Sequence, residues 1–177
     1  MDELFSHEPI QTTILHILNS IRFKNQPYRV QIILPRRRGK TYLAHQIQEN
    51  PMIVPNIFKK DDKIAIFKPN LREDTGVDCF SCYQFRSHLR ERNRSSMRGR
   101  RYDILDSIGS YNGIIFDDCN VDDISMISII LPNVPVIIIG SIDEVDDKTN
   151  IFNVWDYDKI VDVLHKIRVI PMNDIYE

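Results

Sequence analysis

Cysteine is scarce in this chain: only three occur in 177 residues, Cys79, Cys82 and Cys119. So few cysteines cannot build the disulfide framework of a small secreted domain, and they favour a reducing compartment. The sequence also lacks any apolar stretch near the roughly 20 residues that a membrane-spanning helix needs. Its N-terminus has no basic segment followed by an apolar run, as a signal peptide would. We therefore expect an intracellular protein with no membrane partner that is not secreted.

A zinc site is not expected either. Cys79 and Cys82 have the spacing of half a structural zinc site, but such a site needs four ligands and no second pair follows. The five histidines have no metal-ligand spacing. The cysteines are therefore interpreted as ordinary thiols.

The sequence shows neither a large excess of positive charge nor a domain boundary. The formal net charge is −2, so any contact with nucleic acid has to come from a local patch. There is no internal repeat and no low-complexity linker, and 177 residues are enough for one sizeable core. We expect a single domain, residues 1–177.

The most informative stretch is residues 30–41, VQIILPRRRGKT. An apolar, β-branched run ends at a proline, a basic turn follows, and Gly-Lys-Thr precedes a helix predicted at 42–49. This is the strand–loop–helix context of a phosphate-binding loop. Gly39 would let the backbone approach a phosphate, Lys40 would reach the β- and γ-phosphates, and the Thr41 hydroxyl would hold Mg²⁺.

The match to the full pattern G-x-x-x-x-G-K-[ST] is incomplete, because Leu34 stands where the first glycine is expected. The same residues could form a strand, a basic surface turn and a helix whose cap is Thr41. The sequence of the loop leaves both interpretations open.

A second stretch, residues 113–118, has the sequence GIIFDD. Large apolar residues followed by two carboxylates are typical of a buried parallel strand, and open α/β sheets bind ligands at the carboxyl ends of such strands. We assign Asp117 to Mg²⁺ and Asp118 to the base that activates the attacking water. The alternative is a strand that ends in an acidic turn. The first interpretation predicts that Lys40 and Thr41 lie within a magnesium ion's reach of Asp117, across the tips of adjacent strands.

The remaining pattern predicts an α/β fold. Apolar residues at helical spacing predict helices at 10–23, 81–94, 124–131 and 157–166, and apolar runs predict strands at 30–34, 63–67, 113–118, 134–141 and 167–170. The segment 52–62 fits neither. Alternating elements of this kind imply a mostly parallel central sheet that is flanked by helices on both faces.

These motifs resemble the ATPase domain of viral large terminases, the motors that package DNA into capsids, and more broadly the helicase-like P-loop ATPases. In that family the phosphate-binding loop often lacks its first glycine and has a form close to (S/P)-R-R-x-G-K-T, which residues 35–41 fit. The resemblance spans roughly residues 9–142 and implies a three-layer P-loop NTPase. The nucleotide-binding residues that it implies, with ATP as the cofactor, are Gln11, Pro35, Arg36, Arg37, Arg38, Gly39, Lys40, Thr41 and Ser141.

Four of these residues, together with Asp118, receive particular roles. Gln11, near the start of a helix upstream of the loop, would read adenine, or it is a solvated residue at a helix start. Ser141 would sense the γ-phosphate, because the family's strand next to the acidic one ends in a Gly/Ser/Thr motif; an ordinary turn explains Gly-Ser equally well. Catalysis would use Lys40, Asp118 and Arg36, with water attacking in line and the cations neutralising the developing charge.

Residues 86–101 carry seven arginines and a single acid. Clustered arginine is typical of a surface that binds nucleic-acid phosphates. Arg98 or Arg100 could instead be an arginine finger for a neighbouring subunit, or the cluster is a solvated face that offsets the acidic C-terminal half. The family has an arginine-glycine element at this position, similar to residues 96–102. The candidates are Arg90, Arg94, Arg98, Arg100 and Arg101.

The expected function is Mg²⁺-dependent ATP hydrolysis coupled to the handling of double-stranded DNA. The resemblance suggests a viral or mobile-element origin, a homo-oligomeric ring or a capsid or portal partner, and a place in the host cytoplasm or nucleus. Terminases continue into a nuclease domain, for which 177 residues leave no room. Two alternatives stay open: a catalytically degenerate P-loop module for nucleic-acid binding or assembly, and a small nucleotide or nucleoside kinase.

Overall fold

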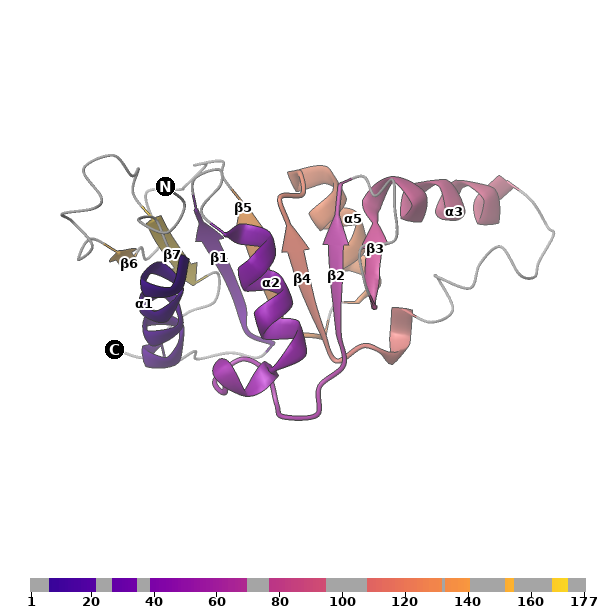
Figure 1. Ribbon diagram of the computed structural model, residues 1–177. Coiled ribbons are helices and arrows are strands. Elements are labelled where there is room, and N and C mark those ends of the chain that lie inside the picture. Colours follow the sequence, from indigo (N-terminus) through magenta and orange to yellow (C-terminus); the bar gives the residue numbers. More distant parts are fainter. Residues whose placement is uncertain are drawn as a thin grey trace.

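The computed structural model describes residues 7–21, 27–34, 39–69, 77–94, 108–131, 133–140, 152–154 and 167–171. Its strands form one seven-stranded sheet in the order β3-β2-β4-β5-β1-β7-β6 (Figure 1). The strands are β1 (Arg29–Ile33), β2 (Ile64–Lys68), β3 (Cys79–Ser81), β4 (Gly113–Asp117), β5 (Val136–Gly140), β6 (Phe152–Val154) and β7 (Ile167–Pro171). The helices are α1 (His7–Ser20), α2 (Lys40–Glu49), α3 (Cys82–Arg94) and α5 (Val121–Ile130), with short 3-10 turns η2 (Pro51–Ile53) and η4 (Ile108–Ser110).

The sheet is mostly parallel, as predicted. Each neighbouring pair from β3 through β2, β4 and β5 to β1 runs parallel. At the other edge β7 is antiparallel to β1, and β6 is antiparallel to β7. All five residues of β4 are buried, which fits the apolar run that precedes Asp117, because a parallel strand covered on both faces has no solvent side.

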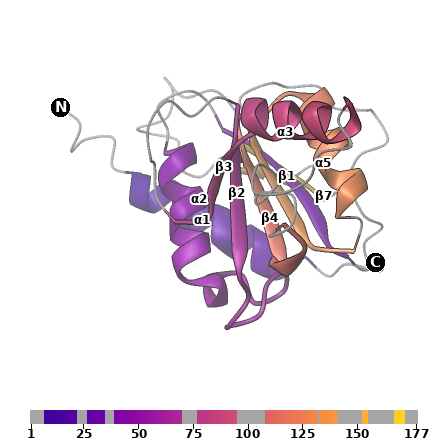
Figure 2. The ribbon, with the colours of Figure 1, turned by 90° about the vertical axis from the view of Figure 1, so that its right-hand side faces the viewer.

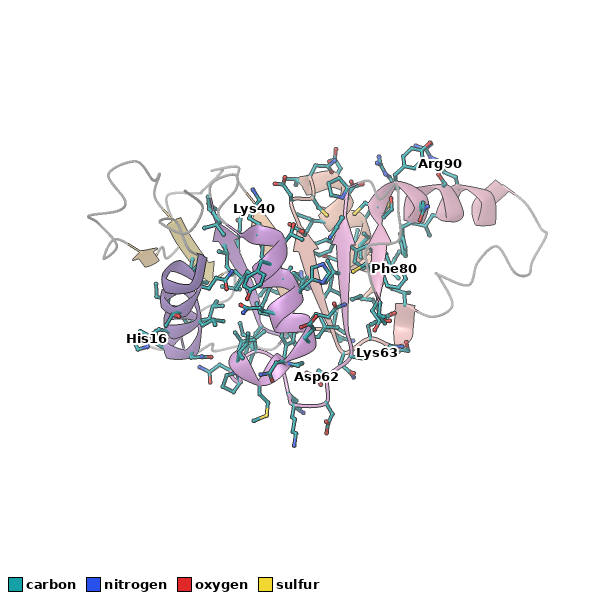
Figure 3. The ribbon with its side chains drawn as sticks, in the orientation of Figure 1. His16, Lys40, Asp62, Lys63, Phe80 and Arg90 are labelled. Atoms are coloured by element: carbon teal, nitrogen blue, oxygen red, sulfur yellow. The ribbon has the colours of Figure 1, made fainter. Side chains whose placement is uncertain are left out.

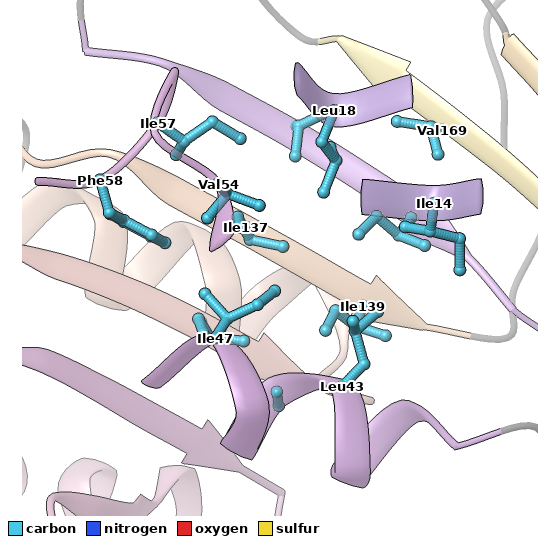
Figure 4. Close-up of a cluster of buried hydrophobic side chains, with 14 of the residues drawn as sticks. Ile14, Leu18, Leu43, Ile47, Val54, Ile57, Phe58, Ile137, Ile139 and Val169 are labelled. Atoms are coloured by element: carbon cyan, nitrogen blue, oxygen red, sulfur yellow. The ribbon is translucent and has the colours of Figure 1, made fainter. Parts of the chain in front are cut away.

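Helices cover both faces of the sheet (Figure 2). On one face α1 and α2 pack with β7 around a core cluster that includes Ile14, Leu43, Ile47 and Val169 (Figure 4). On the other face α3 and α5 pack around a second cluster, to which Phe85 and others contribute. Burying one such side chain contributes about 1.5–3 kcal/mol, so the two clusters supply the main driving force for folding. None of the helices in the described ranges is both long and apolar enough to span a membrane.

The predicted elements agree with the observed ones to within a few residues. The predicted helix at 10–23 corresponds to α1, the one at 81–94 to α3 and the one at 124–131 to α5. The short strands β3 and β6 were not predicted, because three residues carry too little periodicity to distinguish a strand from a loop. The segment 52–62, which fitted no pattern, contains η2 and turns. The helix predicted at 157–166 lies outside the described residues.

Gly113, at the start of β4, allows the closest approach between the sheet and the segment that follows η2. A Cβ at this position would lie 2.9 Å from Cδ1 and 3.2 Å from Cζ of Phe58, whose side chain is only 1% exposed. We therefore expect Gly113→Ala to lower the free energy of unfolding by about 1–3 kcal/mol, the usual cost of overpacking a core. The matched control is Gly109→Ala, where a Cβ would meet no atom of the described residues within 4 Å. Equal urea midpoints for the two variants would contradict this account.

Candidate nucleotide site at the carboxyl edge of the sheet

The carboxyl ends of the five parallel strands lie along one edge of the sheet. Two backbone hydrogen bonds tie the ends of the three central strands together: Leu34 N–H donates to the Gly140 carbonyl at 2.8 Å, and Asp118 N–H donates to the Ile139 carbonyl at 2.7 Å. Figure 3 shows Lys40 at this edge and Lys63 at the opposite one. The Gly-Lys-Thr sequence and the acidic strand end therefore meet at one edge, where α/β folds bind their ligands.

Gly39 caps the start of α2. Its φ of 89° and ψ of 27° are left-handed, a conformation that glycine adopts without the steric cost of a Cβ. Its carbonyl accepts a hydrogen bond from Leu43 N–H at 2.8 Å. Lys40 and Thr41 are the first two residues of α2, so their backbone N–H groups belong to the first turn, which has no intrahelical acceptors and favours an anion.

The burial of Leu34 explains why the loop has no glycine at its first position. Its side chain is fully buried in the core cluster beneath α1 and α2. The first position of the glycine-rich pattern is therefore used for packing, and the residues that could wrap a phosphate begin after it.

Thr41 and Asp117 are in direct contact. The Thr41 hydroxyl donates to Oδ2 of Asp117 at 2.8 Å, across 76 residues of sequence, and Asp117 is only 4% exposed. The predicted proximity of Thr41 to Asp117 is confirmed, whereas that of Lys40 stays a prediction. The alternative in which Thr41 caps the helix is wrong, because Gly39 is the cap. The expectation of adjacent strands is also wrong. β5 lies between β1 and β4, and α2 reaches Asp117 over the tip of β5. A Cβ on Gly140, at that tip, would meet no described atom within 4 Å.

Asp118 lies in the turn directly after Asp117. Its φ of 60° is left-handed, which aspartate tolerates better than most residues other than glycine. Its backbone is held by the hydrogen bond to Ile139, while the residue itself is exposed. The chain thus buries one carboxylate and presents the next one to solvent at the same edge.

The contact between Thr41 and Asp117 fits a magnesium site. Octahedral Mg²⁺ with ligands at about 2.0–2.1 Å holds neighbouring oxygens about 2.9 Å apart, and the two side-chain oxygens are 2.8 Å apart. Within the described residues, no three His, Cys, Asp or Glu side chains are grouped so as to hold a metal. The other ligands would have to be phosphate oxygens and waters, as is usual for Mg²⁺ in phosphate sites.

Gln11 is a buried amide with an unused donor. The residue is 3% exposed, and its Nε2 has no hydrogen-bond partner among the described residues. It belongs to α1, which covers the same face of the sheet as α2 (Figure 2). An unmade hydrogen bond of this kind costs about 1–3 kcal/mol, which a ligand with a matching acceptor would recover. The alternative of a solvated helix-start residue is wrong, because the side chain is buried.

The other predicted site residues lie partly within and partly outside the described part of the chain. Arg90 is exposed on α3, above the carboxyl edge (Figure 3), and Arg94 ends that helix, with its side chain outside the described part. β5 ends at Gly140 and pairs with β4, so the strand before Ser141 does neighbour the acidic one. The remaining candidates lie outside the described residues: Pro35, Arg36, Arg37, Arg38, Arg98, Arg100, Arg101 and Ser141.

The structure adds charged residues that the sequence did not single out. Asp123, in the first turn of α5 and 2% exposed, forms an ion pair with Arg86 of α3, with Nε and Oδ1 3.1 Å apart. Arg86 thus links two helices rather than standing free for nucleic acid. Lys68, at the carboxyl end of β2, lies 3.4 Å from Nε2 of His45, one helical turn after Thr41. Neither pair carries a sequence signal, because each joins residues from separate elements.

Two of the cysteines also meet at this edge. Cys82 is the first residue of α3, Cys119 follows Asp118, and their sulfurs lie 3.5 Å apart. The hydrogen bond with Cys82 raises the pKa of the Cys119 thiol, and burial and the nearby charges of Asp123 and Asp117 raise it further. Cys79 packs against the cluster on the opposite face, so Cys79 and Cys82 do not converge on a common point.

Comparisons with known proteins found no relative of this chain: no protein-family model, no curated protein and no solved structure matches it. An α/β sheet with helices on both faces hosts many unrelated functions. The function therefore has to be argued from the chemistry of the residues at the carboxyl edge.

Proposed function

We propose that this chain is a Mg²⁺-dependent P-loop ATPase of the helicase-like branch, a three-layer P-loop NTPase resembling the ATPase domain of viral large terminases. The contact of 2.8 Å between Thr41 Oγ1 and Asp117 Oδ2 carries the proposal. It joins the two motifs that would share one metal ion, although they are 76 residues apart in sequence. A surface turn and an unrelated acidic strand end would have no reason to converge in this way.

The triphosphate would bind at the start of α2. Three features favour an anion there: the left-handed Gly39, the backbone N–H groups of the first turn, and the ammonium group of Lys40. Arg36, Arg37 and Arg38 would add positive charge from the loop before the helix. Thr41 and Asp117 would hold Mg²⁺, which supplies positive charge to the β- and γ-phosphates when it is bound.

Hydrolysis would depend on Asp118. Its exposed carboxylate lies next to the buried Asp117, in a turn whose backbone is fixed on Ile139, so it would accept a proton from water at the γ-phosphate. Lys40 and Arg36 would stabilise the charge that develops on the transferred phosphoryl group. Ser141, directly after the tip of β5, would sense the γ-phosphate. The product would be ADP and phosphate, with water as the acceptor.

Gln11 would select adenine, because its buried Nε2 can donate to a ring nitrogen. We expect Gln11→Ala to raise the KM for ATP by roughly 10-fold, as the loss of one hydrogen bond to a ligand of about 1.4 kcal/mol implies, with kcat nearly unchanged. The KM for GTP should change much less. The matched control is Asn19→Ala, an exposed amide near the end of the same helix. Parallel changes for ATP and GTP would contradict a role in reading adenine.

Double-stranded DNA is the proposed partner. Arg90 is exposed on α3 above the carboxyl edge, and Arg94, Arg98, Arg100 and Arg101 continue the basic run. Contacts with phosphates release counterions, so a DNA-stimulated ATPase rate should fall steeply with salt. A homo-oligomeric ring or a capsid or portal protein would complete the motor.

The decisive experiment is the ATPase rate of Lys40→Ala. We expect kcat/KM for ATP to fall by about 10²–10³-fold, the usual loss when a group that stabilises transition-state charge is removed. Lys60→Ala, on the exposed turn before β2, is the control and should match the unmodified protein. Phosphate release is measured with and without double-stranded DNA, at two salt concentrations.

Three outcomes would contradict the proposal. Full activity of Lys40→Ala would remove the phosphate-binding loop from the chemistry. ATP binding without turnover in the unmodified protein would favour the catalytically degenerate module. Transfer of the γ-phosphate to a nucleoside or nucleotide, in a screen of acceptors, would favour the kinase.

A further inference from the structure

Cys82 and Cys119 form a thiol pair beside the acidic strand end. Their sulfurs are 3.5 Å apart, and the Cys119 sulfur also donates to the carbonyl of Phe67 at 3.2 Å. The Cys119 sulfur also lies 3.8 Å from the carbonyl oxygen of Asp117, and either thiol can donate to the other. Cys82 is fully buried, whereas Cys119 is only half-buried, so an oxidant would reach the pair at Cys119.

The two sulfurs are separated by a distance that a small movement can close. A disulfide holds its sulfurs about 2.05 Å apart, so the two must approach each other by about 1.5 Å. Both cysteines lie at the ends of elements: Cys82 opens α3, and Cys119 is in the turn between β4 and α5. A small movement there leaves the hydrogen bonds of the sheet intact. We propose that Cys82 and Cys119 are an oxidative modification site, which closes as a disulfide and lowers the activity of the neighbouring site.

The chemistry balances with a hydroperoxide as the oxidant. After the Cys119 thiol loses its proton, hydrogen peroxide oxidises it to a sulfenic acid and is itself reduced to water. Because the pKa of this thiol is raised, the step is slow at neutral pH and faster as the pH rises. The Cys82 sulfur then attacks the Cys119 sulfur, the S–O bond breaks, and the hydroxyl leaves as a second water with the thiol proton. Two thiols and one peroxide thus give one disulfide and two waters. A dithiol reverses the step by exchange, as expected for redox-responsive cysteines in a reducing compartment.

The expected effect on activity follows from the position of Cys119, and this part rests on the proposed ATPase function. Cys119 is bonded directly to Asp118 and is two residues from Asp117. Pulling its sulfur toward α3 breaks the bond to the Phe67 carbonyl and moves the turn that holds the proposed base. A displacement of about 1 Å of a catalytic group can cost about 10²-fold in rate.

The bond itself is tested without any activity measurement. The full chain is treated with hydrogen peroxide, digested without reductant and mapped by mass spectrometry. We expect a peptide that links Cys82 to Cys119 and disappears with dithiothreitol. Cys79→Ser, which alters the thiol on the opposite face, should form the same link, whereas Cys119→Ala should not. A link through Cys79, or oxidation of Cys119 to a sulfonic acid without any link, would overturn the proposal.

The functional part uses the same samples. Turnover of the oxidised protein should fall by about 10²-fold and return with dithiothreitol, while Cys119→Ala, which lacks the thiol that is oxidised first, should be insensitive to peroxide. Circular dichroism of each variant checks that it is folded. A disulfide that forms without a change in turnover would overturn the regulatory effect. A chain that forms the disulfide but has no ATPase activity even when reduced would instead refute the proposed function and leave the modification site standing.

Discussion

Replacing Asp117 by asparagine is expected to lower ATP turnover by about 10²–10³-fold at limiting Mg²⁺, which would be the largest functional effect of a change this small. Asparagine keeps the shape and still accepts the hydrogen bond from Thr41, so the contact of 2.8 Å can persist. What is lost is the negative charge, which a hard cation such as Mg²⁺ needs from its protein ligand. Turnover is measured as a function of Mg²⁺ concentration.

The neighbouring carboxylate provides the matched comparison. Asp118→Asn changes the same chemical group one residue further along, and asparagine tolerates the left-handed φ of 60° as well as aspartate does. We expect this variant to keep the Mg²⁺ dependence of ATP binding and to lose about 10²-fold or more in kcat, because a general base contributes 10²–10⁴-fold. Identical Mg²⁺ titrations for the two variants would contradict the division of roles between a metal ligand and a base.

Truncating Phe67 to alanine is expected to have the largest effect on stability. Its ring is fully buried in β2 and lies 5.5 Å from the ring of Phe80, 5.7 Å from that of Phe85 and 5.8 Å from that of Phe116. Removing a buried phenyl ring costs about 3–5 kcal/mol through lost burial and the cavity left behind. That is a large share of the roughly 5–15 kcal/mol that holds a domain folded.

The control for Phe67 is Tyr83→Ala on α3. Tyr83 is also aromatic, but it is 61% exposed, so its removal should change the free energy of unfolding by no more than about 0.5 kcal/mol. Both variants are measured by urea denaturation with circular dichroism and fluorescence. If Phe67→Ala unfolded at the same urea concentration as Tyr83→Ala, the packing of the face beneath α3 and α5 would be wrong.

Much of the fold could be predicted from the order of apolar segments. The runs that became β2, β4 and β5 are continuous in apolar residues because both faces of these strands are covered, and the run that became β1 is interrupted only by Gln31. α1 has an apolar stripe at helical spacing. Each of these patterns is contained in a short segment, where several neighbouring residues indicate the same element. The strands β3 and β6 have three residues each, too few for a period to emerge.

The types of residue at the candidate site also came from the sequence. Gly-Lys-Thr after one strand and two aspartates after another indicate phosphate and metal chemistry. The start of a helix favours an anion, and carboxylate oxygens are ligands that Mg²⁺ prefers. The sequence could not show that Leu34 is a core residue, or that Gln11 is buried with an unused donor. The burial of a side chain depends on what packs over it. Leu34 and Gln11 are buried because α1 and α2 pack on the same face of the sheet, which the local sequence does not reveal.

The sequence by itself determined the α/β class, the order of the main elements and the residue types at the candidate site, because each depends on short-range periodicity and turn chemistry. Only the tertiary structure decided which strands are neighbours. In the folded chain β5 lies between β1 and β4, the Thr41 hydroxyl contacts Asp117 across the tip of β5, and the sulfurs of Cys82 and Cys119 lie side by side. The physical reason is that strand order is set by which apolar faces the crossover helices can bury together, a property of the whole sheet that no local segment encodes.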